Sequence, residues 1–168
     1  QLGALLISIM AVYTGFVAYF MTRKLAVSEF EKARLATQDS LTGTANRLLF
    51  TIQVEDEIAR ARRVGKDFAL LYIDFDRFKE INDTFGHDIG DQLIILAARR
   101  IQEKLGPNDR LGRFGGDEFG VIQYEIGGVR DCEVLAEALL RTLREPFHCG
   151  AQDLYIGASI GIAVCLRG

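Results

Sequence analysis

The chain has 168 residues and 49% hydrophobic residues, which is enough for one domain of ordinary size plus an additional segment. Its net charge of −3 gives no reason to expect a nucleic-acid groove, so we expect no nucleic-acid partner. The three cysteines have no CxxC spacing and indicate neither a zinc site nor a disulfide framework; they are Cys132, Cys149 and Cys165.

The N-terminal segment, residues 2–22, carries no charge, and its length matches the roughly 20 residues that a helix needs to cross a bilayer. Arg23 and Lys24 follow at once, so we expect residues 1–24 to form a transmembrane helix with a basic anchor that faces the cytoplasm. A signal peptide fits less well, because no basic region precedes the segment, and a buried core helix is the other alternative. Since the chain begins with Gln1, we expect further sequence upstream.

The next segment, residues 25–38, contains no Gly or Pro and predicts a helical linker, although its heptad pattern is weak. A domain then follows over residues 39–168. Asn46 is a candidate cap for a helix that ends near Gly65. The apolar run "FALLYIDFD" that follows has no helical period and predicts a central strand buried on both faces.

The second half of the domain continues this alternation of helices and strands. Residues 86–105 predict an amphipathic helix stopped by Gly106 and Pro107, and residues 110–126 predict two strands around a tight turn. Residues 130–144 predict another helix, and the alternating residues 153–165 predict one final strand. Helices interleaved with strands and a hairpin favour an α/β sandwich.

Two carboxylates, Asp74 and Asp76, end the predicted central strand, and their spacing places them on one face of it. Asp74 is therefore a candidate ligand for a hard cation such as Mg²⁺, which proteins bind through one or two carboxylates plus substrate phosphates. Asp117 and Glu118 follow the glycines of the predicted hairpin turn and could serve the same ion in phosphoryl transfer. A turn-initiating Asp pair and a solvated acidic turn are the alternatives.

Other polar residues nearby have the chemistry to bind a nucleotide. Lys79 could reach phosphate oxygens as a point charge, and Asn82 and Asp91 could bind a guanine edge. The alternatives are a surface lysine, a turn at Asn82, and an N-cap pair formed by Asp88 and Asp91. His87 is a single histidine in a Gly-His-Asp loop, for which a structural role is the more common one.

Four stretches, taken together, resemble the GGDEF family of diguanylate cyclases from Asp39 to the end of the chain. They are "DSLTG" followed by "NR", "DFDRFKEINDTFGHDIGD", "RFGGDEF" and "SIGIA", in this order. The resemblance implies a central, mostly antiparallel sheet flanked by helices, similar to nucleotidyl cyclase and polymerase palm domains. It also implies that two GTP molecules condense into cyclic di-GMP with release of two pyrophosphates.

The resemblance further implies roles for individual residues. Asp74, the backbone carbonyl of Phe75, and Asp117 are the implied ligands of Mg²⁺ or Mn²⁺. Asp117 is also the implied base for the ribose 3′-OH, with Glu118 beside it, and Lys79 the implied phosphate contact. The implied substrate contacts are Asn82 and Asp91, which would bind guanine, together with Phe78, His87, Gly115 and Gly116.

The family pattern also sets expectations about assembly and regulation. We expect a homodimer in the bacterial inner membrane, with the GGDEF domain in the cytoplasm and with possible fused sensor and downstream domains. Gly106 stands where members with product inhibition have an arginine, although Asp109 is present. The family's final helix is missing before Gly168, so we expect the natural chain to continue. The alternative function is a catalytically weak, GTP-binding regulatory module for a fused domain such as a cyclic di-GMP phosphodiesterase.

Overall fold

A computed structural model describes residues 16, 19–21, 23–24, 36–150 and 152–165 of the chain, which fall into two compact units divided after Ala36. In the first unit the described residues are helical, and the ring centroids of Phe16 and Phe20 lie 5.0 Å apart. No helix among the described residues is both long and apolar enough to span a membrane. The predicted span and linker lie mostly outside the described residues, so both stay predictions.

The second unit, from Thr37 on, contains a five-stranded sheet, a two-stranded hairpin and four helices within its described residues. The elements in chain order are β1 (Ala45–Asn46), α2 (Arg47–Val64), β2 (Asp67–Asp76), α3 (Phe78–Phe85), α4 (His87–Lys104), β3 (Arg110–Gly115), β4 (Glu118–Ile126), α5 (Val129–Leu143), β5 (Phe147–Cys149), β6 (Gln152–Leu154) and β7 (Gly157–Cys165).

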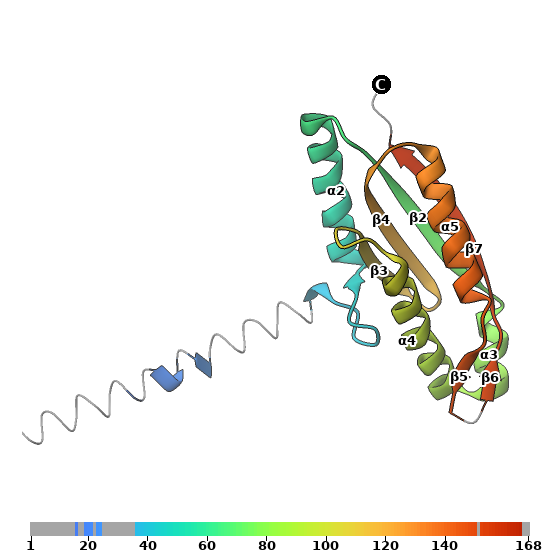
Figure 1. The fold of residues 1–168 in the computed structure, drawn as a ribbon. Coiled ribbons are helices and arrows are strands. Elements are labelled where there is room, and N and C mark those ends of the chain that lie inside the picture. The colour runs from blue at the N-terminus through green and yellow to red at the C-terminus, as the bar shows by residue number, and fades with distance from the viewer. Residues whose placement is uncertain (1–15, 17–18, 22, 25–35, 151, 166–168) are drawn as a thin grey trace, which may run out of the picture. The chain divides into compact units, whose positions relative to one another are not determined.

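The strand order in the main sheet is β1-β3-β4-β2-β7, and β2 lies between β4 and β7 (Figure 1). Only the pairing of β1 with β3 is parallel, and the other three pairings are antiparallel. The mostly antiparallel sheet flanked by helices that we predicted is therefore confirmed.

One face of this sheet is covered by α4 and α5 and forms the main core (Figure 1). The stripes predicted on these two helices face inward, because Leu93, Ala97 and Ile101 of α4 and Leu139 and Leu143 of α5 are fully buried. They pack against alternate residues of β2 and β4, as the period of two along a strand requires. The main core also encloses the side chains of Cys132 and Cys149.

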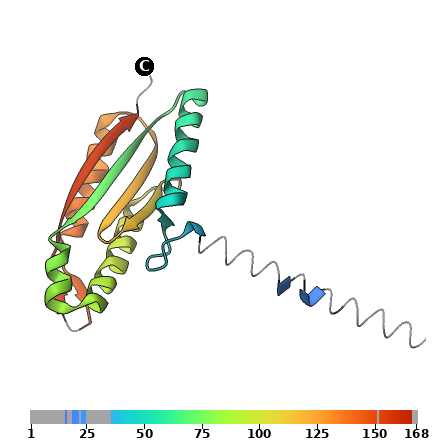
Figure 2. The ribbon, with the colours of Figure 1, turned by 180° about the vertical axis from the view of Figure 1, so that it is seen from behind.

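The opposite face is covered by α2 over only part of its width. Asn46 caps α2 by accepting a 3.0 Å hydrogen bond from the Leu49 amide, as predicted. Phe50 of α2 packs closely on the sheet: a side chain on Gly112 or Gly120 would clash with its ring. In Figure 2, β2 and β7 lie beside α2 with no helix in front of them.

This partial cover corrects one prediction about the central strand. We expected β2 to be buried on both faces, but Tyr72 is 43% exposed, because α2 covers only part of this face and leaves one side of the Tyr72–Phe114 ring pair open. Gly161 and Ala163 of β7 line a groove on this uncovered part of the sheet, together with Tyr72.

One alternative and one further prediction are wrong. The sequence "FKEINDTF" forms helix α3, whereas the alternative for Asn82 was a turn. This helix lies between the end of β2 and Gly86, and it is too short to give a clear helical periodicity in the sequence. The alternating residues 153–165 form two strands instead of one. β6 ends at Leu154 and pairs with β5 in a separate hairpin, because the chain changes sheets at Tyr155 and Ile156. In Figure 1 this hairpin and α3 lie at the same end of the main sheet.

Candidate metal and nucleotide site

The carboxylates predicted at the end of β2 lie on the face of the sheet that α2 leaves open. Asp74 stands directly opposite Glu118 of β4, and Asp76 stands opposite Gly157 of β7. The Ser159 hydroxyl donates a 2.9 Å hydrogen bond to Asp76, which leaves little room beside it: a side chain on Gly157 would meet the same carboxylate. Like charges opposite each other destabilise a sheet, so the pairing of Asp74 with Glu118 is not explained by folding alone.

The pKa of Asp74 reports the same crowding. Burial raises it, and the neighbouring carboxylates of Asp117, Glu118 and Asp76 raise it further. Within the part of the chain that the structure describes, neither Asp74 nor Asp117 has a hydrogen-bond or ion-pair partner. Arg47 pairs with Glu118, but no described cation pairs with Asp74 or Asp117, so negative charge is concentrated at the strand end, which is the electrostatic environment that a divalent cation needs.

The predicted metal set fits this arrangement. Among the described residues no group of three or more His, Cys, Asp or Glu side chains is placed to hold a metal ion, but the predicted set requires only two carboxylates and a carbonyl. The Phe75 side chain is buried in the main core, so only its backbone carbonyl is free for such a role. Asp74, Asp117 and that carbonyl would hold the cation, and substrate phosphates would supply further ligands.

The β3–β4 turn that carries Asp117 depends on its two glycines. Gly115 has φ 131° and Gly116 has φ 54°, values that favour glycine, so the predicted role of the pair in the turn is confirmed. Arg113 holds the turn from the side, because its Nη2 and Nε donate to the Gly116 carbonyl at 2.7 and 3.1 Å. The turn is thus fixed by a side chain whose role we did not predict.

Arg113 also connects the turn with the start of the second unit. Its Nη1 donates to both carboxylate oxygens of Asp39 at 3.0 and 3.1 Å, and both side chains are largely buried. Burial alone would raise the pKa of Asp39, but hydrogen bonds from Thr42 and from Arg113 outweigh it and lower that pKa. Asp39 is therefore held ionised, and Arg113 is held between it and Gly116.

Glu118 differs from Asp117 because it has partners. Arg47 at the start of α2 lies 3.6 Å from its carboxylate, and Tyr72 donates a hydrogen bond to it. That hydrogen bond, together with burial and the negative charges of Glu118 and Asp74, raises the pKa of Tyr72 to about 12. Glu118 is thus oriented by two side chains, whereas Asp117 is left free to bind.

The predicted guanine ligands lie on α3 and α4, which pack against each other. A side chain on Gly90 would clash with the Asn82 amide oxygen, so the amide lies directly over Gly90. Asp91 follows Gly90 on α4 and is exposed. The structure therefore places Asn82 against the turn of α4 that carries Asp91, and Gly90 is a further site residue that we did not predict. A glycine inside an amphipathic helix was the only signal for it.

The remaining candidates are placed differently. Lys79 is exposed on the first turn of α3, and His87 is exposed at the start of α4. The Phe78 side chain is 8% exposed and belongs to the main core, so any contact that Phe78 makes with a substrate would involve its backbone.

Asp109, which the family pattern connects with product inhibition, has two backbone partners. One carboxylate oxygen accepts from the Gly106 amide at 2.8 Å, and the other accepts from the Tyr124 amide at 3.0 Å. The carboxylate therefore stabilises the turn before β3.

Comparison with known proteins identifies the family. Residues 36–167 match the family described as diguanylate cyclase, GGDEF domain. The chain is 42% identical over 155 residues to the probable diguanylate cyclase DgcC of Escherichia coli K12, which covers 89% of this chain and 40% of that protein. It is 38% identical over 144 residues to the bifunctional diguanylate cyclase/cyclic di-GMP phosphodiesterase MucR of Pseudomonas aeruginosa, and this match covers 86% of this chain and 21% of that protein. The chain spans less than half the length of these relatives.

Solved structures give the same result. The GGDEF domain of TpbB (also YfiN) from Pseudomonas aeruginosa has a TM-score of 0.73 and 34% identity, and the match covers 76% of this chain and 74% of that one. The coiled coil and GGDEF domain of DgcB from Caulobacter crescentus, in complex with cyclic di-GMP, has a TM-score of 0.81 and 27% identity over 88% of this chain and 79% of that one. The family prediction made from the motifs is confirmed: the chain belongs to the GGDEF diguanylate cyclase family.

Proposed function

We propose that this protein is a diguanylate cyclase, which condenses two GTP molecules into cyclic di-GMP and two pyrophosphates. The observation that carries the proposal is the pair of carboxylates without partners, Asp74 and Asp117, beside a glycine turn that Arg113 holds in place. A domain that used this region only for folding would gain stability by neutralising these charges. The signature turn is also intact, which favours catalysis over a purely structural role.

The proposed chemistry uses the side chains as follows. A bound Mg²⁺ or Mn²⁺ supplies charge stabilisation for the phosphates. Asp117 takes the proton from the ribose 3′-OH of one GTP, and the oxygen then forms a bond to the α-phosphorus of the other GTP. The bond from that phosphorus to the bridging oxygen of pyrophosphate breaks, and pyrophosphate leaves. The same exchange in the opposite direction closes the ring.

Binding and orientation are assigned to the remaining residues. Asn82 and Asp91 bind the guanine edge, since an amide and a carboxylate match its acceptors and its N–H donors. Lys79 contacts phosphate oxygens, and Gly115 and Gly116 allow phosphates to approach the backbone of the turn. His87 and the Phe78 backbone are secondary contacts. Glu118, which Arg47 and Tyr72 orient, lies beside Asp117, the proposed general base.

Assembly and location are part of the proposal. One domain has one GTP site, whereas the product joins two nucleotides symmetrically, so a homodimer with facing sites is required. Residues 2–22 would anchor the protein in the bacterial inner membrane, and residues 25–38 would align the two cytoplasmic domains. A second candidate is a regulatory GTP-binding module, which the bifunctional relative MucR makes reasonable because its name includes phosphodiesterase activity.

The test is incubation of the full-length protein with GTP and Mg²⁺, followed by chromatography of the products. We expect cyclic di-GMP and pyrophosphate in a ratio of one to two, and a specific activity that rises with enzyme concentration. GTP binding without product would favour the regulatory module, and activity that stays constant down to concentrations at which the protein is monomeric would contradict the dimer.

A further inference from the structure

The starting observation is an arginine in an unfavourable backbone conformation next to the acidic strand end. Arg77 connects β2 with α3 and has φ 60° and ψ 30°, in the left-handed region that favours glycine and asparagine. Among the described residues only Glu125 shares a positive φ without being glycine, and its side chain is held by Lys66 at 2.6 Å and Arg60 at 3.4 Å. Within the same set of described residues, Arg77 has no ion pair as short as those of Glu125, so protein contacts do not explain why an arginine occupies this position.

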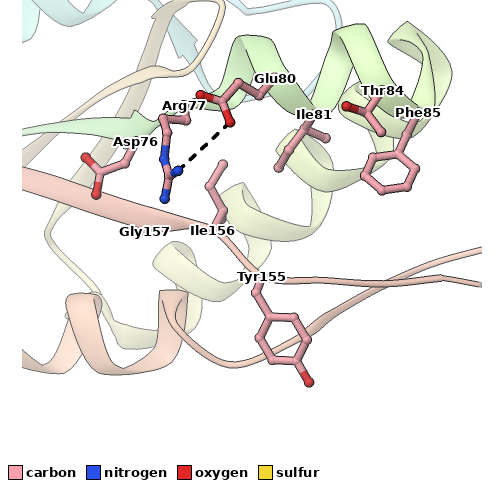
Figure 3. Close-up of a pocket in the computed structure, with 9 residues that line it drawn as sticks. All are labelled: Asp76, Arg77, Glu80, Ile81, Thr84, Phe85, Tyr155, Ile156 and Gly157. Carbon is pink, nitrogen blue, oxygen red and sulfur yellow. Dashed lines mark ion pairs between the residues drawn. The ribbon is translucent and has the colours of Figure 1, made fainter.

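The other arginines close to the site are engaged. Arg47 pairs with Glu118 and lies over the Phe114 ring, and Arg113 binds Asp39 and Gly116. The Arg77 side chain is 80% exposed, and within the described residues its one ion pair, at 4.0 Å, is with Glu80, which is itself 68% exposed. In Figure 3 the dashed line from Arg77 runs only to Glu80. An exposed pair at that distance contributes little, so the guanidinium is available to a ligand.

The position of Arg77 indicates which part of a ligand it would meet. Arg77 and Asp76 line a cavity of about 340 Å³ between α3 and the connection from β6 to β7 (Figure 3). Asn82 lies on another side of α3, where it packs on Gly90 of α4. Asp74 lies two residues before Asp76 on the same face of β2. A nucleotide with its base at Asn82 and its phosphates at the strand end would thus extend its terminal phosphates toward Arg77.

We propose that Arg77 binds the β- and γ-phosphates of GTP and is a substrate-positioning residue. This inference rests on the proposed function for the identity of the nucleotide. A guanidinium forms two parallel hydrogen bonds to phosphate oxygens, which explains why an arginine is retained where glycine or asparagine would fit the backbone better. Arg77 already lines the cavity in this structure, together with Glu80.

Titration calorimetry on the full-length protein tests this, with a non-hydrolysable GTP analogue and with GMP as ligands in the presence of Mg²⁺. We expect Arg77→Gln to weaken binding of the analogue about tenfold (~1.4 kcal/mol) and to leave GMP binding unchanged, because GMP lacks the terminal phosphates. Arg77→Lys should lie in between. The matched control is Arg130→Gln, since Arg130 is 73% exposed and pairs with Glu133 three residues on, as Arg77 does with Glu80.

Arg77→Asn separates binding from folding. It suits the left-handed backbone, so its melting temperature should be no lower than that of the wild type while binding of the analogue is weakened. Unchanged binding of the analogue by the Arg77 variants, or equal weakening for GMP, would overturn the inference. If the wild type makes no cyclic di-GMP, the proposed function fails, but the ratio of the two affinities still decides the role of Arg77. If the wild type is active and the variants bind normally, only the inference fails.

Discussion

The two ends of strand β2 differ in whether the carboxylates near them are paired with cations. At its start, Glu57 of α2 is 3% exposed but forms hydrogen bonds of 2.7 and 3.0 Å with Arg60, and Glu125 of β4 pairs with Lys66. At its other end, Asp74 faces other carboxylates and has no cation within the described part of the domain. The first arrangement serves folding. The second is unfavourable for folding, which indicates that this end is kept for binding.

The largest effect is expected at the acidic end. Asp74→Asn or Asp117→Asn should reduce cyclic di-GMP formation at least about 100-fold, because each substitution removes a charge from the metal and phosphate site. Product chromatography on the full-length variants measures this, with circular dichroism as the control for folding. Near-normal turnover by either variant would show that the metal ligands are assigned incorrectly.

The paired end should respond in the opposite way. Arg60→Gln leaves the buried carboxylate of Glu57 without its cation, and we expect a loss of about 2 kcal/mol in the free energy of unfolding, below the range for fully buried pairs because Arg60 is partly exposed. Turnover of the folded fraction should stay normal. Urea unfolding and initial rates measure the two quantities, and a variant that is stable but inactive would contradict the division between the two ends.

Arg113 tests how the turn is held at the acidic end. Arg113→Lys keeps the charge but cannot bridge Asp39 and Gly116 together, so turnover should fall about tenfold with a small loss of stability. Because the pKa of Asp39 is lowered on folding, the stability that this carboxylate contributes is present near neutral pH and is lost as the pH falls through its lowered value. Asp39→Asn should therefore flatten the loss of stability at acidic pH, and an unchanged profile would exclude this contribution.

Gly90 should have a smaller effect that is specific to the nucleotide. Gly90→Ala forces the Asn82 amide away from its present position, so the KM for GTP should rise a few-fold while kcat and the melting temperature change little. Gly161→Ala is the matched control, because nothing lies within 4 Å of a side chain added there. Equal KM values for Gly90→Ala and the wild type would remove Asn82 from the guanine site.

The smallest effect is expected at Asp109. Its two carboxylate oxygens already bind backbone amides, and Gly106 offers no guanidinium, so added cyclic di-GMP should inhibit only weakly at this position. Initial rates against product concentration measure this. Strong non-competitive inhibition that disappears in Asp109→Ala would contradict it.

The contrast between the two ends was only partly predictable from the sequence. The period of two along β2 places Asp74 and Asp76 on one face, and the glycine turn places Asp117 and Glu118 at the neighbouring strand. The bridge from Asp39 through Arg113 was not predictable, because its partners lie 74 residues apart and neither of the stretches that contain them, "DSLTG" and "RFGGDEF", shows from its own pattern that it contacts the other. The role of Gly90 was not predicted either, since it depends on how helices α3 and α4 pack against each other.

Helix α3 and the β5–β6 hairpin were missed for a local reason. Eight residues give barely two turns of periodicity, and the left-handed conformation of Arg77, which starts α3, has no sequence signal when the residue is not glycine. The hydrophobic alternation of residues 153–165 continues across the two connecting residues, Tyr155 and Ile156, so the pattern did not show where one strand ends.

Thermal unfolding of the wild type and Asp74→Asn, each with and without Mg²⁺, tests the central claim most directly. Because the pKa of Asp74 is raised on folding, protonation of this carboxyl stabilises the fold, and that contribution is lost as the pH rises through the raised pKa. At neutral pH without Mg²⁺, the neutral Asp74→Asn should therefore melt at or above the wild type, and Mg²⁺ should raise the melting temperature of the wild type alone. A variant that melts lower than the wild type without Mg²⁺, and gains as much from Mg²⁺, would contradict the account.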